Sequence, residues 1–345
     1  MDSLTQIALG GAVGYAVLGK QHGRKAILWG AALGTLPDLD VLIPYGGEIE
    51  NFTYHRGFSH SLFVQLLITP FIAWLAQKIH PVTNASFGRW CVMIYLTLSS
   101  HALLDTCTVY GTQLLWPITE YPFSFNNLFI IDPLYTIPLL IGLGFASSKR
   151  LSDQTRTIMN VSGLVISSIY ILWSFVGKAL IDQKIEQAMT LKGITAQHYI
   201  SSPAALNTLL WRAVIIQDTQ YYEVYASVFD EPTEISFSPY LTQPNLLTAL
   251  PDTWHIQRLQ WFTKGLYKVR AIDQDIVFSD LRMGVECAYA FNFVVGQFQT
   301  GPEGKQKIIA GPYSKITERP DLSALTDIWQ RIWEPQVALA PQVSC

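Results

Sequence analysis

Residues 61–79 read SLFVQLLITPFIAWLAQKI, an apolar run that contains no charged residue before Lys78. A helix needs roughly 20 apolar residues to span the ~30 Å hydrocarbon core of a bilayer, so this run predicts a transmembrane helix. The whole chain of 345 residues agrees, because half of it is hydrophobic and only 14% is charged. A typical soluble domain has about 25% charged residues. The composition therefore indicates a membrane protein.

Five further segments resemble this run in length or apolarity. They are residues 4–19, 26–45, 90–110, 130–147 and 158–181. The sequence thus predicts an α-helical membrane bundle of about six transmembrane segments. We place it in residues 1–182, as a transmembrane helical domain.

The second part of the chain has a different composition. Residues 1–182 contain 10 Lys and Arg and 10 Asp and Glu, whereas residues 183–345 contain 13 and 16 in a shorter stretch. Short β-rich runs are separated there by proline and glycine, which favours strands joined by turns. The runs are 209–216, 221–229, 261–270, 275–280 and 288–296, after a helical stretch over 182–191. Residues 183–345 are therefore predicted to be a small mainly-β or α+β soluble domain.

Basic residues indicate how the segments are oriented. Eight of the ten Lys and Arg in residues 1–182 fall in alternate loops, at Lys20, Arg24, Lys25, Lys78, Arg89, Lys149, Arg150 and Arg156. Basic loops of inner-membrane proteins face the cytoplasm. The expectation is a multi-pass protein of the cytoplasmic membrane whose C-terminal domain is extracytoplasmic.

Two classes of function are excluded by charge and cysteine content. A net charge of −3 provides no basic surface for nucleic acid, so no nucleic-acid partner is expected. The four cysteines, Cys91, Cys107, Cys287 and Cys345, are spaced irregularly and form neither a disulfide scaffold nor a CxxC metal site.

Ionisable residues inside membrane segments are costly and are candidates for function. Here they form three groups, which read LPDLD at 36–40, HRGFSHS at 55–61 and HALLD at 101–105. The predicted topology places all three at the outer leaflet. Taken singly, each has a structural reading: a helix-end cap, a polar loop and a hydrogen-bonded pair. Their agreement on one side favours a metal or proton site.

The spacing also supports a shared centre. His101 and Asp105 are four residues apart and so share one helix face. Pro37 predicts a break that can turn Asp38 and Asp40 inward. The nitrogen and oxygen ligand set suits Zn best, with Mn or Fe as alternatives, in one or two ions. The candidate ligands are Asp38, Asp40, His55, His60, His101 and Asp105.

These motifs, together with Asp2-Ser3-Leu4-Thr5, Gly111-Thr112-Gln113 and Ile131-Asp132-Pro133, resemble a bacterial family. It is the family of inner-membrane metal-dependent hydrolases, also catalogued as LexA-binding, inner-membrane-associated hydrolases. The resemblance implies a metal-dependent hydrolase that uses the six ligands above. Many members have a His where this chain has Gln6, which is a poor ligand for a transition metal. Trp211-Arg212 and residues 279–284 resemble the extension of longer members.

The main hypothesis is a hydrolase that attacks an ester or phosphoester of a lipid or lipid-linked substrate at the outer leaflet. A metal would activate water, whichever of Asp38, Asp40 and Asp105 is not a ligand would take its proton, with Asp38 and Asp105 as the main candidates, and Arg56 would stabilise the developing oxyanion. Two alternatives stay open. One is a membrane-anchored binding or regulatory protein with a structural metal and a protein partner at the C-terminal domain. The other is a transporter.

Overall fold

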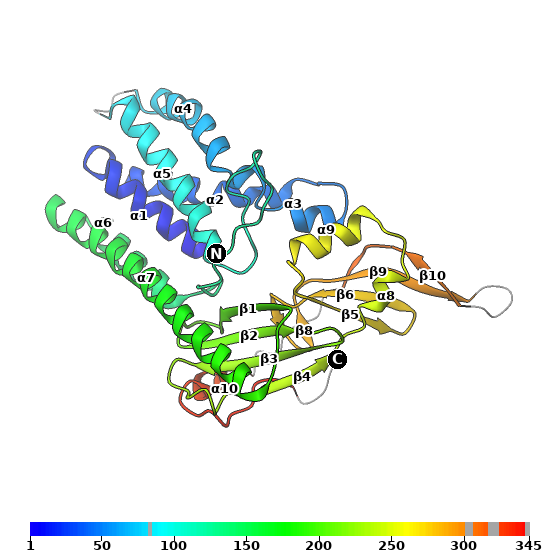
Figure 1. Cartoon of the computed structure of the whole chain (residues 1–345). Helices are drawn as coiled ribbons and strands as arrows, with labels where there is room; N and C mark the ends of the chain where they lie inside the picture. Colours follow the sequence, from blue (N-terminus) through cyan, green and yellow to red (C-terminus); the bar gives the residue numbers. More distant parts are fainter. Residues whose placement is uncertain (82–84, 301–305, 317–323, 342–345) are drawn as a thin grey trace. The chain divides into compact units, whose positions relative to one another are not determined.

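The computed structural model describes residues 1–81, 85–300, 306–316 and 324–341 (Figure 1). The chain divides into two compact units. The helical unit comprises Met1–Ile43, His55–Val176 and Ala205–Asn207, and the β-rich unit comprises Pro44–Tyr54, Gly177–Ala204 and Thr208–Cys345. The proposed domain boundary at residue 182 stays a prediction.

Helices and 3₁₀ turns make up the first half of the chain. They are α1 (Ser3–His22), α2 (Arg24–Thr35), η1 (Pro37–Leu42), α3 (Glu48–Tyr54), η2 (Phe58–His60), α4 (Leu62–Ile79), α5 (Phe87–Thr106), α6 (Pro133–Ala146) and α7 (Asp153–Lys192). All but α3 and the end of α7 lie in the helical unit. Within that unit α1 packs on α2, α5 and α6, and α4 packs on α5.

The prediction of about six transmembrane segments is wrong. Among the described residues, two helices are long and apolar enough to cross a membrane, α4 and α7. α2 and α6 have 12 and 14 residues, which gives lengths of about 18 and 21 Å at 1.5 Å per residue. α1 and α5 are long enough but carry many glycines or polar side chains. α7 is one continuous helix of 40 residues, so the predicted segments 158–181 and 182–191 are not separate.

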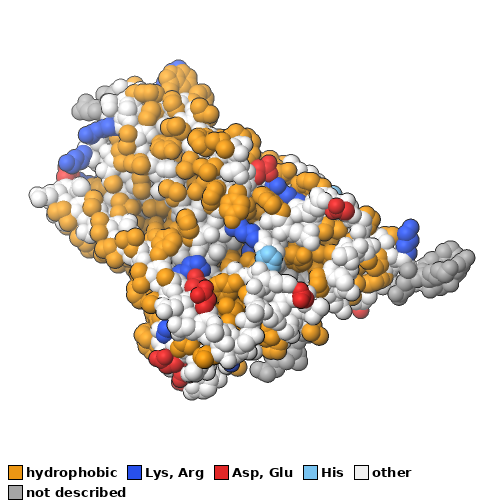
Figure 2. All heavy atoms as spheres, viewed as in Figure 1, with side chains coloured by type: hydrophobic (Ala, Val, Ile, Leu, Met, Phe, Trp, Pro, Cys, Tyr) orange, Lys and Arg blue, Asp and Glu red, His pale blue; other side chains and the backbone are white. Residues whose placement is uncertain are grey.

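The outer surface of the helical unit is nonetheless apolar. Figure 2 shows hydrophobic side chains gathered over these helices on the face drawn there. Exposed examples on α4 include Leu67 and Phe71, and exposed examples on α7 include Ile169 and Leu172. Apolar patches larger than a few hundred Å² are rare on soluble monomers. The surface is therefore suited to a lipid environment.

α1 and α2 pack backbone against backbone through glycine. A Cβ placed on Gly30 would lie 2.0 Å from the carbonyl oxygen of Gly10, and one on Gly34 would lie 2.5 Å from that of Gln6. Only glycine permits this approach. The close packing fixes the end of α2, from which η1 continues.

The β-rich unit contains two main antiparallel sheets and a small hairpin. The strands of the first are β1 (His198–Pro203), β2 (Leu210–Ile216), β3 (Gln220–Ser227) and β4 (Phe237–Leu241), in that order. The second has the order β10 (Gln306–Ala310), β9 (Asn292–Thr300), β6 (Asp275–Asp280) and β5 (Tyr267–Ile272), with β11 (Lys315–Ile316) beside β9. The hairpin joins β7 (Gly284–Val285) to β8 (Ala288–Tyr289). The remaining helices are α8 (Asn245–Thr248), α9 (Trp254–Phe262) and α10 (Ala324–Arg331).

The predicted strand over 261–270 is only partly correct, because its first residues end α9 and β5 begins at Tyr267. Thr253 caps α9, since its side chain accepts a hydrogen bond from the backbone N–H of Ile256. Ile256, Leu259 and Phe262 are buried at intervals of three residues, which is the period of a helix. Residues 261 and 262 therefore belong to a helix, although their aromatic side chains favour a strand.

The first sheet is covered on one face by the end of α7. Ile181, Ile185 and Ala188 pack there against Trp211 and Ala213 of β2. Arg212 lies on the opposite face of β2 and is buried there beside Glu223 of β3. Arg212 donates a hydrogen bond to the carbonyl of Leu281 (2.9 Å), so the two motifs of the C-terminal extension meet.

α3 belongs to the β-rich unit although it lies between Asp40 and His55 in the sequence. Its Phe52 is buried against three aromatic rings, with centroid separations of 4.8 Å to Phe262, 4.4 Å to Phe291 and 5.3 Å to Phe293. The packing of α3 thus depends on residues more than 200 positions later in the chain.

A disulfide at Cys287 was not predicted from the sequence. Cys91 and Cys107 are free, whereas Cys287 is disulfide-bonded. Cys345 lies outside the described residues. Irregular spacing alone does not reveal such a bond.

Candidate metal centre

Four side chains from three elements converge at one end of the helical unit. Asp38 lies on η1, His60 ends η2, and His101 and Asp105 lie one turn apart on α5. Each offers one ligand atom, and the four atoms lie within 4.8 Å of one another. Three of these side chains are almost wholly buried, whereas Asp38 is 25% exposed. Asp38 is therefore the member on the solvent side.

The separations fit a tetrahedral transition metal. His60 Nε2 lies 3.1 Å from His101 Nε2, 3.3 Å from Asp105 Oδ2 and 3.5 Å from Asp38 Oδ1. His101 Nε2 lies 3.5 Å from Asp38 Oδ1 and 3.6 Å from Asp105 Oδ2. Zinc–ligand bonds of about 2.0–2.2 Å place tetrahedral ligands about 3.3–3.6 Å apart. The five distances lie in or next to that range.

Hydrogen bonds at the far side of each imidazole select the tautomer. His101 Nδ1 donates to the carbonyl oxygen of Gly34 (2.6 Å), which leaves a lone pair on Nε2. Ser59 Oγ donates to Asp40 Oδ2 (2.6 Å) and so accepts from His60 Nδ1 (2.9 Å). Both Nε2 atoms then direct lone pairs at the same point as two carboxylate oxygens. A cation is the group that fits this arrangement.

The buried atoms of the carboxylates support the same conclusion. Asp38 Oδ1 and Asp105 Oδ2 are buried and accept no hydrogen bond, and these are the two atoms that face the imidazoles. Asp105 Oδ2 has the Arg56 guanidinium on its other side, whereas a buried carboxylate oxygen such as Asp38 Oδ1, with no hydrogen bond, favours a bound cation. The donor set fits a divalent metal such as zinc.

A second group of residues holds Asp105 in place. Its Oδ1 accepts hydrogen bonds from Gln6 Nε2 (2.9 Å) and from the amine of Met1. Arg56 Nε lies 3.1 Å from Oδ2, and Arg56 Nη1 donates to Thr108 (3.2 Å). Gln6 is therefore a supporting residue that holds Asp105. The Arg56 guanidinium is engaged with Asp105, and its predicted contact with an oxyanion stays a prediction.

Asp40 and His55 form a separate pair beside the four ligands. His55 Nδ1 lies 2.7 Å from Asp40 Oδ1, and Asp40 Oδ2 accepts from the backbone N–H of Arg56 (2.9 Å). Asp40 Oδ2 also accepts a hydrogen bond from the Ser59 hydroxyl (2.6 Å). Asp40 is thus the group that orients the His55 ring. The imidazole itself is partly exposed.

The six proposed ligands therefore separate into two sets. Asp38, His60, His101 and Asp105 form the candidate centre, while Asp40 and His55 lie outside it. The supporting roles of Ser59 and of the Gly34 carbonyl were not predicted from the sequence. For Ser59 the signal in the sequence is its position directly before His60.

Two other motifs have structural roles. The backbone N–H of Gln113 donates to the carbonyl of Arg56 (3.0 Å) and so fastens a loop beside the site. Asp132 caps α6 by accepting from the N–H groups of Leu134 and Tyr135, and it also accepts from the Tyr170 hydroxyl (3.0 Å). Neither motif contributes a metal ligand to the described cluster.

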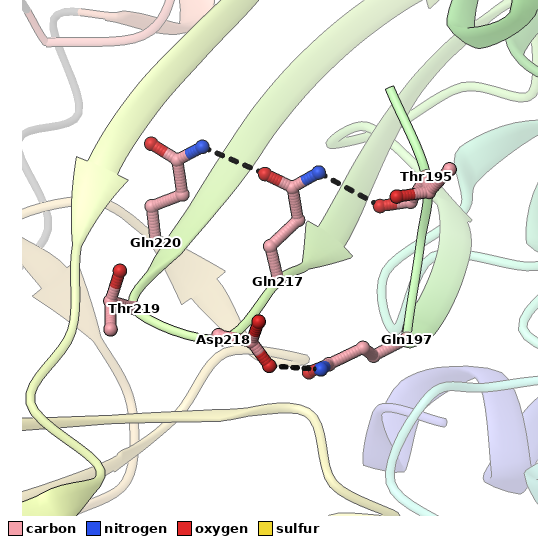
Figure 3. Close-up of a pocket in the computed structure, with 6 residues that line it drawn as sticks. All are labelled: Thr195, Gln197, Gln217, Asp218, Thr219 and Gln220. Carbon is pink, nitrogen blue, oxygen red and sulfur yellow. Dashed lines mark hydrogen bonds between the residues drawn. The ribbon is translucent and has the colours of Figure 1, made fainter. Parts of the chain in front are cut away.

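A polar pocket in the β-rich unit offers different chemistry (Figure 3). It is lined by Thr195, Gln197, Gln217, Asp218, Thr219 and Gln220. Figure 3 shows these side chains bonded to one another: Gln220 donates to Gln217 (2.7 Å) and Gln217 donates to the Thr195 carbonyl (2.9 Å). The amide groups of this pocket are engaged with one another, with Asp218 and with the backbone, and we assign no chemistry to it.

A comparison with known protein families gives a match over the first half of the chain, which contains the helical unit up to the middle of α7. The family model described as YdjM inner membrane protein matches residues 1–181, slightly more than half of the 345 residues. No curated protein and no solved structure matches the chain. The matched region contains all four residues of the candidate centre.

Proposed function

The chain belongs to the YdjM inner membrane protein family, and from that premise we propose that it is a metal-dependent hydrolase of the cytoplasmic membrane. The substrate we propose is an ester or phosphoester of a lipid or lipid-linked molecule. The observation that carries the proposal is the tetrahedral spacing of Asp38, His60, His101 and Asp105, with both imidazole Nδ1 atoms already hydrogen-bonded.

The three buried residues of the candidate centre and the partly exposed Asp38 are suited to different roles in binding a metal and a substrate. His60, His101 and Asp105 are fixed by hydrogen bonds from their surroundings, so they would hold the metal. Asp38 lies on the solvent side and leaves room for an incoming group. A bound zinc-like ion would lower the pKa of a water molecule toward ~7 and polarise the scissile ester.

His55 is suited to proton transfer. Asp40 fixes its Nδ1, so Nε2 is the atom available for exchange with solvent or substrate. The ring centroid of His55 lies 6.3 Å from that of His60, which places it next to the centre without making it a ligand. A carboxylate-oriented histidine near a metal is a general acid or base in many hydrolases. We assign this role to His55 in place of Asp38 or Asp105.

Two observations support an extracytoplasmic position for the site. Arg24 bonds the Ser147 carbonyl (2.6 Å) and His22 contacts His80 and Trp90, so the basic ends of the helices gather away from Asp105. Basic ends favour the cytoplasm. The disulfide at Cys287 favours an oxidising compartment for the β-rich unit. A C-terminal alkaline phosphatase fusion should be active and a C-terminal green fluorescent protein fusion dark; the reverse pattern would overturn this orientation.

The decisive experiment measures metal and activity together. Full-length protein in detergent is assayed by elemental analysis and for hydrolysis of phosphatidylglycerol and p-nitrophenyl esters. We expect about one equivalent of zinc or manganese, lost in His101→Ala and retained in His198→Ala, whose histidine is exposed on β1. Metal without any hydrolysis would point to a binding or regulatory protein, and absence of metal would refute the centre.

A further inference from the structure

The short helix that carries Asp38 has a second, apolar face. In a 3₁₀ helix the side chains at i and i+3 are eclipsed, so every third residue lies on one side. Leu36, Leu39 and Leu42 occupy such positions at and along η1, and all three are exposed. η1 therefore directs a carboxylate at the candidate centre and presents leucines to the surroundings.

This apolar face continues onto a candidate membrane helix. η1 packs against η2, and η2 packs against α4. Phe58 of η2 is exposed, as are Phe63, Leu66 and Leu67 on α4. The exposed apolar surface therefore runs from α4, which is long and apolar enough to cross a membrane, to the helix that bears Asp38.

Lipid is the occupant that these observations favour. The face consists of three leucines and Phe58 and has no polar group, whereas protein interfaces are enriched in Tyr, Trp, Phe, Met and Arg, so only Phe58 matches that composition. Large exposed apolar surfaces are unfavourable in water, and this one is continuous with the surface of a membrane-spanning candidate in a family of inner membrane proteins. A water-filled approach to the centre would not require leucines along its rim.

We propose that the η1 face, formed by Leu36, Leu39, Leu42 and Phe58, lies among lipid acyl chains and admits a lipid substrate to the centre sideways from the bilayer. The entry of a lipid substrate rests on the proposed function. The contact between the η1 face and lipid depends on neither metal nor activity, so the lipid contact and the proposed function can fail separately.

Photo-crosslinking tests the lipid contact directly. The full chain carries p-benzoylphenylalanine at Leu42 and is reconstituted in nanodiscs of phosphatidylglycerol and phosphatidylethanolamine. Leu241 on β4 provides the matched control, because it is 73% exposed against 76% for Leu42. After irradiation, mass spectrometry should find phospholipid adducts at position 42 and not at 241. A second probe at Leu39 covers the case in which the first variant does not fold.

The outcomes separate the possibilities. Crosslinks from both probe positions to protein alone would overturn the inference in favour of a second copy or another protein, and the absence of lipid adducts would overturn it as well.

Lateral entry has its own measurement: in Leu39→Ser/Leu42→Ser the KM for vesicle phosphatidylglycerol should rise about tenfold with unchanged metal content. An unchanged KM would overturn lateral entry. Lipid adducts in a chain without hydrolase activity would refute the proposed function and keep the lipid face.

Discussion

Ser59→Ala should weaken metal binding although Ser59 is not a ligand. Its hydroxyl donates to Asp40 (2.6 Å) and accepts from His60 Nδ1 (2.9 Å), so it fixes both the tautomer and the direction of the His60 ring. Loss of such a supporting hydrogen bond typically costs 10–100-fold in metal affinity. We therefore expect the Kd to rise by about that factor, which is roughly 1.4–2.7 kcal/mol.

The assay is competition between the protein and a zinc-chelating dye. Protein in detergent is first stripped of metal and then titrated, which gives the Kd without any assumption about a substrate. Ser59→Thr keeps the hydroxyl and should stay within about threefold of the wild type.

Ser100→Ala is the matched control. Ser100 precedes the ligand His101 and is half-buried like Ser59, but its hydroxyl bonds the Thr97 carbonyl within α5 (3.0 Å). Its replacement should leave the Kd nearly unchanged. Equal losses in the two alanine variants, or no loss in Ser59→Ala, would show that the assigned tautomer of His60 does not matter for binding.

Three further predictions concern stability and are measured by thermal unfolding of the full chain in detergent. Gly30→Ala should destabilise the protein by about 1–3 kcal/mol or more, because the new Cβ would lie 2.0 Å from the Gly10 carbonyl oxygen. Gly88→Ala is the control and should not destabilise the protein, because a Cβ at Gly88 meets open space. Equal destabilisation by the two substitutions would contradict the close packing of α1 on α2. Glu286→Gln should cost about 3–5 kcal/mol because it removes the negative charge that lies 2.7 and 2.9 Å from the buried Lys268 ammonium. Lys268→Met/Glu286→Leu should recover most of this loss, and additive losses would refute the coupling. Burial, and then the cation of Arg282, lowers the pKa of Lys264 to about 8, so between that pH and the ordinary pKa near 10.5 the unfolded chain binds more protons and stability should rise with pH. Lys264→Met should remove this rise, and an identical pH profile in both proteins would refute it.

Local spacing predicted that His101 and Asp105 lie on one face of a helix. His101 and Asp105 are four residues apart, and a continuous helix leaves little freedom in where they point. Asp38 and Asp40 were less predictable, because their directions depend on how the chain breaks at Pro37. The 3₁₀ geometry directs Asp38 to the centre and Asp40 to His55, and neither outcome follows from the sequence spacing.

The number of membrane segments was overestimated for a physical reason. Apolarity was counted along the chain, but the small residues of α1 serve close helix packing through Gly10, and α5 carries His101 and Asp105 of the candidate centre. The break after Thr35 also shortens α2 below the thickness of a bilayer. Hydropathy does not separate a helix that packs on protein from one that faces lipid.

The position of α3 has a consequence for the order of events during synthesis. Phe52 leaves the ribosome long before Phe262, Phe291 and Phe293, against which it packs. At a translation rate of about 5–20 residues per second, the wait is roughly 10–50 s. Until then Phe52 has not made the three ring contacts that bury it in the complete protein. Synthesis of the chain through β9 is therefore the event that completes the burial of α3 within the β-rich unit.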